Sequence, residues 1–308
     1  MKIKNSNITN KNIASYLNSD FHGKECVVKT IDSFPNTKRN SVSFLKYKIE
    51  EEVKRVQNST VITFEYNLKK LEKCGVATII SDNPKYDFAK IYHKFFNLPS
   101  SYKIDRSLIK GKNVEIDHEV NIGPNVVIGD DVKIKQGAEI SPNVVLYKNV
   151  TVNKNVKILS GSVIGGRAFS YGLVDEHLSE DSYRMPSIGR VVLEEGVEIG
   201  NNCVISRGIF KDTLIKRNTR INDLTHIGNS VVINENTLVM ANVDISGKVE
   251  IGKNCWIAQS SCIRQGVRIA DNVQVGMGSV VTNDVEKDSV VSGSPAKFMR
   301  KRKTNIFK

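Results

Sequence analysis

The chain has 308 residues, of which 40% are hydrophobic and 25% charged, so it is too apolar for a generally disordered protein. No stretch approaches 18 uninterrupted apolar residues, which excludes a transmembrane helix, and the first residues lack the apolar core of a secretory signal. The five cysteines form no CxxC pair, so they indicate neither a disulfide framework nor a zinc knuckle. We therefore expect a cytoplasmic protein without a transmembrane segment.

The formal net charge is +12, and half of this excess lies in residues 297–308. This basic tail contains Lys297, Arg300 and four further lysines or arginines, and no acidic residue. Such a tail attracts phosphates, nucleic acid or an acidic protein, or it is simply a solvated terminus. The composition leaves these alternatives open.

Residues 1–100 predict a small α+β domain. Residues 13–17 have the pattern of a short amphipathic helix, and residues 85–97 carry apolar positions at helical spacing, with Pro99 as a stop. Between these two segments, short runs of β-branched and apolar residues predict strands at 26–28, 42–45, 59–64 and 76–80.

A six-residue period begins near residue 114 and dominates the rest of the chain. A Val or another small residue stands two positions before most of the aliphatic anchors, and strand alternation turns both inward. Three such steps close one coil of about 18 residues, so residues 101–296 predict a parallel β-helix of roughly eight coils. The anchors are Ile116, Ile122, Ile128, Ile134, Ile140, Leu146, Val152, Ile158, Ile164, Leu193, Ile199, Ile205, Ile215, Ile221, Ile227, Ile233, Val239, Ile245, Ile251, Ile257, Ile263, Ile269, Val275 and Val281.

Asn or Asp recurs three positions after many anchors. These two residue types tolerate the left-handed backbone conformation that a tight corner requires. We therefore expect the corners of the helix at Asn125, Asp131, Asn143, Asn155, Asn202, Asn236, Asn254 and Asn272.

The period breaks twice, at residues 166–188 and 206–213. An insertion into a regular stack must leave it as a loop, and loops on a rigid scaffold commonly build binding sites. The first insertion carries Phe169 and Tyr171, which we expect to contact a substrate. The alternative is that both insertions are merely tolerated.

The repeated Ile/Val/Leu-Gly hexapeptide resembles that of the hexapeptide acyltransferases, whose members wind as left-handed β-helices and assemble as trimers. The order of an N-terminal domain, an Ala168–Gly172 loop, a Pro186–Val191 segment and an Arg207–Thr213 loop resembles the UDP-3-O-acylglucosamine N-acyltransferases of lipid A synthesis. This resemblance covers about residues 10–295. It implies that the N-terminal domain holds a nucleotide base and that an acyl group passes from a thioester to a sugar amine on the β-helix.

The same resemblance places the general base at Asn229, where the family has histidine and this chain does not. An asparagine cannot accept a proton at neutral pH, but His226 lies three residues earlier, beside Asn222 and Asp223. Strand alternation turns His226 outward, so it is a candidate base, with Asp223 to orient it. Alternatively, His226, Asn229 and Asn222 only contact the acceptor, or the histidine is structural.

The acyl donor would lie near the last coils. The family's second histidine corresponds to Gly266, so an oxyanion would depend on backbone N–H groups there. Gly276 and Gly278 let an extended pantetheine approach the backbone, and Lys297 and Arg300 can meet phosphates. The resemblance therefore implies acyl-CoA, acetyl-CoA above all, or an acyl-carrier-protein thioester as co-substrate, with no tightly bound cofactor.

For the nucleotide base, Phe44 and Tyr47 are the candidate aromatic pair, although core packing explains Phe44 equally well. The scattered histidines do not match a zinc β-helix, so we expect no metal, and no nucleic-acid partner either.

Together these observations predict a homotrimeric N-acyltransferase for a nucleotide-linked amino sugar, in cell-surface polysaccharide or lipopolysaccharide synthesis. The first alternative is UDP-3-O-(3-hydroxyacyl)glucosamine N-acylation in lipid A synthesis itself, with acyl carrier protein as partner. The second is an inactive β-helical scaffold.

Overall fold

The computed structural model describes residues 2–3, 8–35, 37–50, 58–97, 103–173, 179–180 and 182–302. These residues form two compact units, one comprising Met1–Pro99 with Phe307–Lys308 and the other comprising Ser100–Ile306. Each unit has its own hydrophobic core.

The N-terminal unit is a five-stranded sheet with helices packed on it. Its strand order is β2-β6-β5-β4-β3, with only β2 antiparallel to its neighbour, and a separate strand pair joins β1 to β7. The predicted strand at 26–28 is an isolated bridge at Val27, and the second helix was not predicted. The elements are β1 (Lys2–Ile3), α1 (Asn10–Leu17), β2 (Phe21–His22), β3 (Thr30–Ile31), β4 (Ser41–Leu45), β5 (Thr60–Thr63), the 3-10 helix η1 (Glu65–Asn67), α2 (Leu68–Lys73), β6 (Ala77–Ile80), α3 (Pro84–Phe95) and β7 (Phe96–Asn97).

The two longer helices of this unit begin where the sequence provides caps. The Thr9 hydroxyl accepts a hydrogen bond from the backbone N–H of Asn12, whose side chain accepts one from Thr9 in return. Asn83 caps α3 and Pro84 occupies its first turn, where a missing N–H costs nothing. Both helices then bury one apolar side, Ile13 in α1 and Ile91 in α3, against the sheet.

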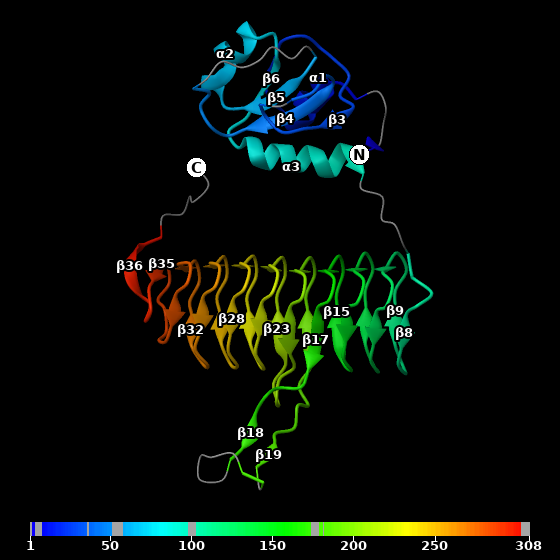
Figure 1. The fold of residues 1–308 in the computed structure, drawn as a ribbon, viewed down its shortest axis with the longest axis vertical. Coiled ribbons are helices and arrows are strands. Elements are labelled where there is room, and N and C mark those ends of the chain that lie inside the picture. Colours follow the sequence, from blue (N-terminus) through cyan, green and yellow to red (C-terminus); the bar gives the residue numbers. More distant parts are fainter. Residues whose placement is uncertain are drawn as a thin grey trace. The chain divides into compact units, whose positions relative to one another are not determined.

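The second unit is a three-faced parallel β-solenoid (Figure 1), which confirms the predicted fold class. One face carries β10 (Asn121–Ile122), β13 (Glu139–Ile140), β16 (Lys157–Ile158), β21 (Glu198–Ile199), β24 (Arg220–Ile221), β27 (Leu238–Val239), β30 (Trp256–Ile257), β33 (Gln274–Val275), β35 (Ser289–Ser292) and β36 (Lys297–Lys301). The second carries β8 (Ile109–Lys110), β11 (Val127–Ile128), β14 (Val145–Leu146), β17 (Val163–Gly166), β22 (Val204–Ser206), β25 (His226–Ile227), β28 (Asp244–Ile245), β31 (Cys262–Ile263) and β34 (Val280–Val281). The third carries β9 (Glu115–Ile116), β12 (Lys133–Ile134), β15 (Val150–Val152), β20 (Val191–Leu193), β23 (Thr213–Ile215), β26 (Val232–Ile233), β29 (Glu250–Ile251) and β32 (Arg268–Ile269).

The aliphatic anchors form the core of this solenoid. Every predicted anchor is buried except Ile116 in the first coil, which packs against the core half-buried. Each anchor lies in register on the anchor of the neighbouring coil, as Ile140 does on Ile122 and on Ile158. All eight predicted corner residues have positive φ, between 53° and 60°, as the turn chemistry predicts.

The first insertion leaves the stack after β17 and forms an antiparallel strand pair, β18 (Tyr171–Gly172) with β19 (Tyr183–Arg184), before the chain re-enters at β20 (Figure 1). Residues 174–178 and 181 of this insertion lie outside the described residues. The second insertion, between β22 and β23, is a short irregular loop.

The first residues of the basic tail form part of the solenoid. Lys297–Lys301 form β36, which pairs antiparallel with β35, and the Arg302 guanidinium donates hydrogen bonds to the carbonyls of Asn254 and Val273. Only residues 303–308 lie outside the description there. The first part of the tail is therefore attached to the last coils.

Within the described residues, no helix is long and apolar enough to cross a bilayer, and no group of three or more metal-ligating side chains comes together.

Candidate active site

His226 points outward from the second face of the solenoid, where it pairs with a carboxylate of the next coil. His226 and Asp244 are register partners on β25 and β28, and their Nδ1 and Oδ1 atoms lie 2.6 Å apart. Half of each side chain is exposed, so solvent or a ligand reaches the pair. A carboxylate at Nδ1 fixes the tautomer in which Nε2 is free to accept a proton.

The carboxylate beside His226 differs from the one predicted. Asp223 was expected to orient the histidine, but its Oδ1 accepts hydrogen bonds from the backbone N–H and the side-chain amide of Asn201, at 2.7 and 3.1 Å. Asp223 therefore closes a corner of the stack, and the carboxylate within hydrogen-bonding distance of His226 is that of Asp244. One coil spans 18 residues here, so the interval from 226 to 244 was the signal for this pair.

Asn229 occupies the corner that follows His226. Its side chain lies against Gly247 of the next coil, since a Cβ at Gly247 would be 2.6 Å from Asn229 Oδ1. Its carbonyl accepts a hydrogen bond from the backbone N–H of Lys248. The side chain is half-buried and lies three residues from the histidine, so both groups belong to one edge of the solenoid.

Asn222 has a local structural contact. Its Oδ1 accepts a hydrogen bond from the backbone N–H of Asp223 at 2.8 Å, and its own carbonyl accepts one from the Cys203 thiol. These bonds explain why an asparagine stands in this turn, and its side chain is exposed.

The first insertion brings its aromatic residues together. The Phe169 and Tyr171 rings meet edge to face with centroids 5.3 Å apart, and the Arg184 guanidinium lies over both rings, at 5.7 and 5.4 Å. Phe169 is 85% exposed, whereas Tyr171 lines a pocket of about 680 Å³ between the insertion and the third face. Phe210 and Val232 line the same pocket, which makes part of its wall apolar.

The second insertion is held by an ion pair that the sequence analysis did not single out. Asp212 accepts three hydrogen bonds from Arg190, one from its backbone N–H and two from its guanidinium, at 2.8 to 3.1 Å. Burial alone would raise the pKa of Asp212, but the hydrogen bonds and charge of Arg190 outweigh it, so the pKa lies below its usual range.

The glycines predicted for the acyl donor have structural explanations. Gly266 and Gly278 have φ of +75° and +66° and stand at corners, where other coils have asparagine. Their backbone N–H groups donate to Gly247 and Gln259, and that of Gly276 donates to Val291. These three N–H groups already pair with carbonyls of neighbouring coils.

Lys297 and Arg300, also predicted at the donor site, lie on β36 and are exposed. Both belong to the last coils, as do the three glycines, so the predicted donor residues are grouped at the C-terminal end of the solenoid.

The two aromatic residues predicted for the nucleotide base have different surroundings in the N-terminal unit. Phe44 is half-buried in the core, with its ring 5.0 Å from that of Phe88, which supports the packing explanation. Tyr47 is 65% exposed and carries the Lys46 ammonium 5.0 Å over its ring. Phe64 and Tyr66, which the sequence analysis did not single out, stack at 5.2 Å.

Comparisons with known proteins identify the repeat. The family model described as bacterial transferase hexapeptide (six repeats) matches residues 111–142, 131–166 and 248–283. A UDP-3-O-acylglucosamine N-acyltransferase of Coxiella burnetii is 32% identical over 231 residues, which cover 68% of this chain and 66% of that protein. One of Helicobacter pylori is 42% identical over 176 residues, covering 52% of this chain and 51% of that protein. The chain thus spans just under two thirds and about half of these relatives.

Among solved structures, the UDP-N-acetylglucosamine O-acyltransferase of Moraxella catarrhalis superposes with a TM-score of 0.58 at 23% identity. The match covers 66% of this chain and 76% of that one. At this identity the likeness concerns the fold alone.

Proposed function

We propose that this chain, which carries the bacterial transferase hexapeptide and resembles the UDP-3-O-acylglucosamine N-acyltransferases, is an N-acyltransferase for a nucleotide-linked glucosamine. The observation that carries the proposal is the His226–Asp244 pair on the outward face of the hexapeptide coils. The names of the relatives favour the UDP-3-O-acylglucosamine acceptor, the first alternative of the sequence analysis, over a different amino sugar.

The reaction needs a base for the attacking amine. The sugar nitrogen attacks the thioester carbonyl carbon, and its proton passes to Nε2 of His226 while Nδ1 donates to Asp244. The tetrahedral intermediate then collapses, the carbon–sulfur bond breaks, and the leaving sulfur takes the proton from His226. An amide and a free thiol result, so the histidine returns to its starting form.

Asn229 replaces the family's histidine and acts as a positioning residue in this proposal. Its half-buried amide lies at the edge next to His226, where it can hydrogen-bond the acceptor sugar but cannot take its proton. The acyl donor is a thioester of coenzyme A or of acyl carrier protein, and the exposed basic strand β36 supports a phosphate-bearing donor.

The assembly proposed is a homotrimer in the cytoplasm. Large apolar side chains of the insertions are exposed on the single chain, among them Phe169, Ile188 and Phe210. A neighbouring solenoid would cover such groups. Light scattering after size exclusion tests this part, and a monomeric mass would contradict it.

The activity test pairs acetyl-CoA and a 3-hydroxyacyl carrier-protein thioester with UDP-3-O-acylglucosamine and with other UDP- and dTDP-amino sugars. Acceptor-dependent release of free thiol, with the acylated product identified by mass spectrometry, is the expected result. If no pair releases thiol from the folded protein, the scaffold alternative replaces the enzyme.

Substitutions test the catalytic role of the His226–Asp244 pair, which we call the dyad. His226→Ala lowers kcat by roughly 10²–10⁴-fold, the usual contribution of a general base, and Asp244→Asn lowers it less because the histidine remains. His118→Ala, at an exposed histidine in the first coils, is the matched control and keeps full activity. Equal rates for His226→Ala and His118→Ala would remove the proposed site.

A further inference from the structure

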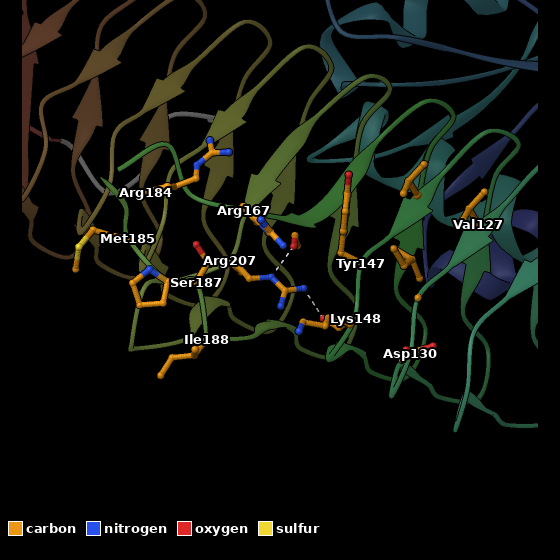
Figure 2. A pocket seen from close by; sticks show the side chains of 15 residues that line it. Val127, Asp130, Tyr147, Lys148, Arg167, Arg184, Met185, Ser187, Ile188 and Arg207 are labelled. Carbon is orange, nitrogen blue, oxygen red and sulfur yellow. Dashed lines mark hydrogen bonds between the residues drawn. The ribbon is translucent and has the colours of Figure 1, made fainter. Parts of the chain in front are cut away.

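A pocket of about 850 Å³ lies between the second face of the solenoid and the returning segment of the first insertion (Figure 2). Its lining contains four cationic side chains and one carboxylate, so the formal charge of the lining is +3. The cations are Lys148, Arg167, Arg184 and Arg207, and the carboxylate is Asp130. None of the residues assigned to the acyl-transfer dyad is among the lining residues.

Arg207 is the buried member of this group, with 3% of its surface exposed. Its Nε donates to the Gly165 carbonyl at 2.7 Å and its Nη2 to the Lys148 carbonyl at 2.5 Å, as the dashed lines in Figure 2 show. Among the described residues, no carboxylate lies within 4.0 Å of the guanidinium of Arg207 or of Arg167. A buried charge held only by carbonyl dipoles leaves an electrostatic cost that an anion can offset.

The neighbouring cation adds to this cost. Burial lowers the pKa of Arg207, and the charge of Arg167 lowers it further. Figure 2 shows the Arg167 side chain directed toward Arg207, with Lys148 on the other side of Arg207. Cations gathered at one wall of a cavity attract an anion with more than one oxygen, because each can donate to it.

The rest of the pocket wall is apolar and aromatic, which indicates an organic ligand. Val127, Val145, Met185 and Ile188 line the pocket, together with the half-exposed ring of Tyr147. Apolar and aromatic surface contributes little to a free inorganic anion but stabilises the organic part of a phosphorylated molecule.

One lining residue of the pocket, Arg207, lies next to the coil that carries His226. Ile205 and Ile227 are register partners, and Arg207 follows β22, the strand that pairs with the His226 strand β25. Neighbouring strands of a sheet are about 5 Å apart. Arg207 is thus the lining residue nearest in the stack to the coil of His226, while Val127 and Val145 lie further away, on β11 and β14.

We propose that this pocket binds the phosphoryl group of an organic phosphate. The choice of ligand rests on the proposed function: the phosphoryl group belongs to the nucleotide of the acceptor or to coenzyme A. Arg167 and Arg207 hold the phosphoryl oxygens, and Arg184, fixed by the Phe169 and Tyr171 rings, closes the rim.

Calorimetric titration of the full chain at low ionic strength with pyrophosphate, UDP and coenzyme A tests the proposal. Saturable binding with one site per chain is expected, tighter for an organic phosphate than for pyrophosphate. Arg167→Gln, at an exposed side chain that leaves the core intact, weakens it about tenfold through loss of one charged hydrogen-bond donor. Arg220→Gln removes the same charge from a different face and leaves affinity within about twofold.

The relative affinities for UDP and coenzyme A identify the ligand of the pocket. Tighter UDP than coenzyme A binding assigns the pocket to the nucleotide, and the reverse assigns it to the donor. Absence of saturable binding for all three ligands, or equal weakening by Arg167→Gln and Arg220→Gln, would overturn the site. The titration is independent of the thiol-release assay. Ligand binding by a protein that releases no thiol in that assay overturns only the proposed function, and thiol release without ligand binding overturns only this pocket.

Discussion

The regular coils and the interrupted stretch between residues 166 and 213 differ in which side chains they bury and which they expose. In the regular coils the anchors are buried and the corner asparagines serve the backbone. In the interrupted stretch, large apolar side chains such as Phe169 and Phe210 are exposed, while Arg207 is buried. Repetition thus builds a rigid support, and departures from it supply side chains that the fold itself does not need.

The largest effect expected from this contrast is on stability in a regular coil. Ile158→Ala removes a fully buried side chain stacked between Ile140 and Ile199, so the free energy of unfolding falls by about 2–5 kcal/mol. Ile188→Ala, at a side chain that is 66% exposed in the insertion, changes it by less than about 0.5 kcal/mol. Urea unfolding measures both, and equal losses would contradict the division of roles.

A smaller effect is expected where the two regions join, at two adjacent glycines. Gly165 has φ +85°, and a Cβ there would lie 2.7 Å from Val150 Cγ2, so Gly165→Ala costs about 1–3 kcal/mol. A Cβ at Gly166 meets nothing within 4 Å, and Gly166→Ala is close to neutral. Thermal unfolding of both variants checks the difference, and an unchanged midpoint for Gly165→Ala would show that the junction relaxes.

The smallest effect concerns the ion pair of the second insertion. Asp212→Asn loses the carboxylate that accepts three hydrogen bonds from Arg190, which costs about 1 kcal/mol at pH 7. The pKa of Asp212 is lowered by folding, so this contribution is present above the ordinary aspartate pKa of about 3.9 and is lost as pH falls through the lower folded value.

Stability curves of wild type and Asp212→Asn at pH 7 and in acid measure this loss, and they should converge at low pH. Asp271→Asn is the control, because Asp271 caps the Lys253 backbone N–H without an arginine and should show a smaller loss. If wild type and Asp212→Asn still differed in free energy of unfolding in acid, the stability loss would not come from the ion pair.

The β-helix could be predicted because its physics is local. A six-residue apolar period needs only strand alternation and tight corners, so anchors and asparagine corners could be identified from their spacing alone. Corners without asparagine were less visible: Leu224 and Lys248 also have φ near 59°, imposed by the stack rather than by their own preference.

The candidate site was harder to predict because its contacts run between coils. His226 was identified and Asp244 was not, because Asp244 lies one coil further along the chain and meets the histidine only through the stacking of β28 on β25. The Arg207 guanidinium is held by the carbonyls of Gly165 and Lys148, 42 and 59 residues earlier in the chain, and no six-residue period predicts such contacts. Short elements such as α2 lack enough turns for a clear pattern.

The strand β36 also bears on how long this solenoid can be. A parallel stack ends in unpaired backbone groups that could accept another coil, from this chain or from a second molecule. On one face, an antiparallel strand covers that edge and exposes Lys297, Arg300 and Lys301. The antiparallel direction of β36 and the repulsion between its positive charges and those of a second molecule both oppose end-to-end growth into fibres. The basic residues that suit a phosphate thus also keep further coils from adding to this edge.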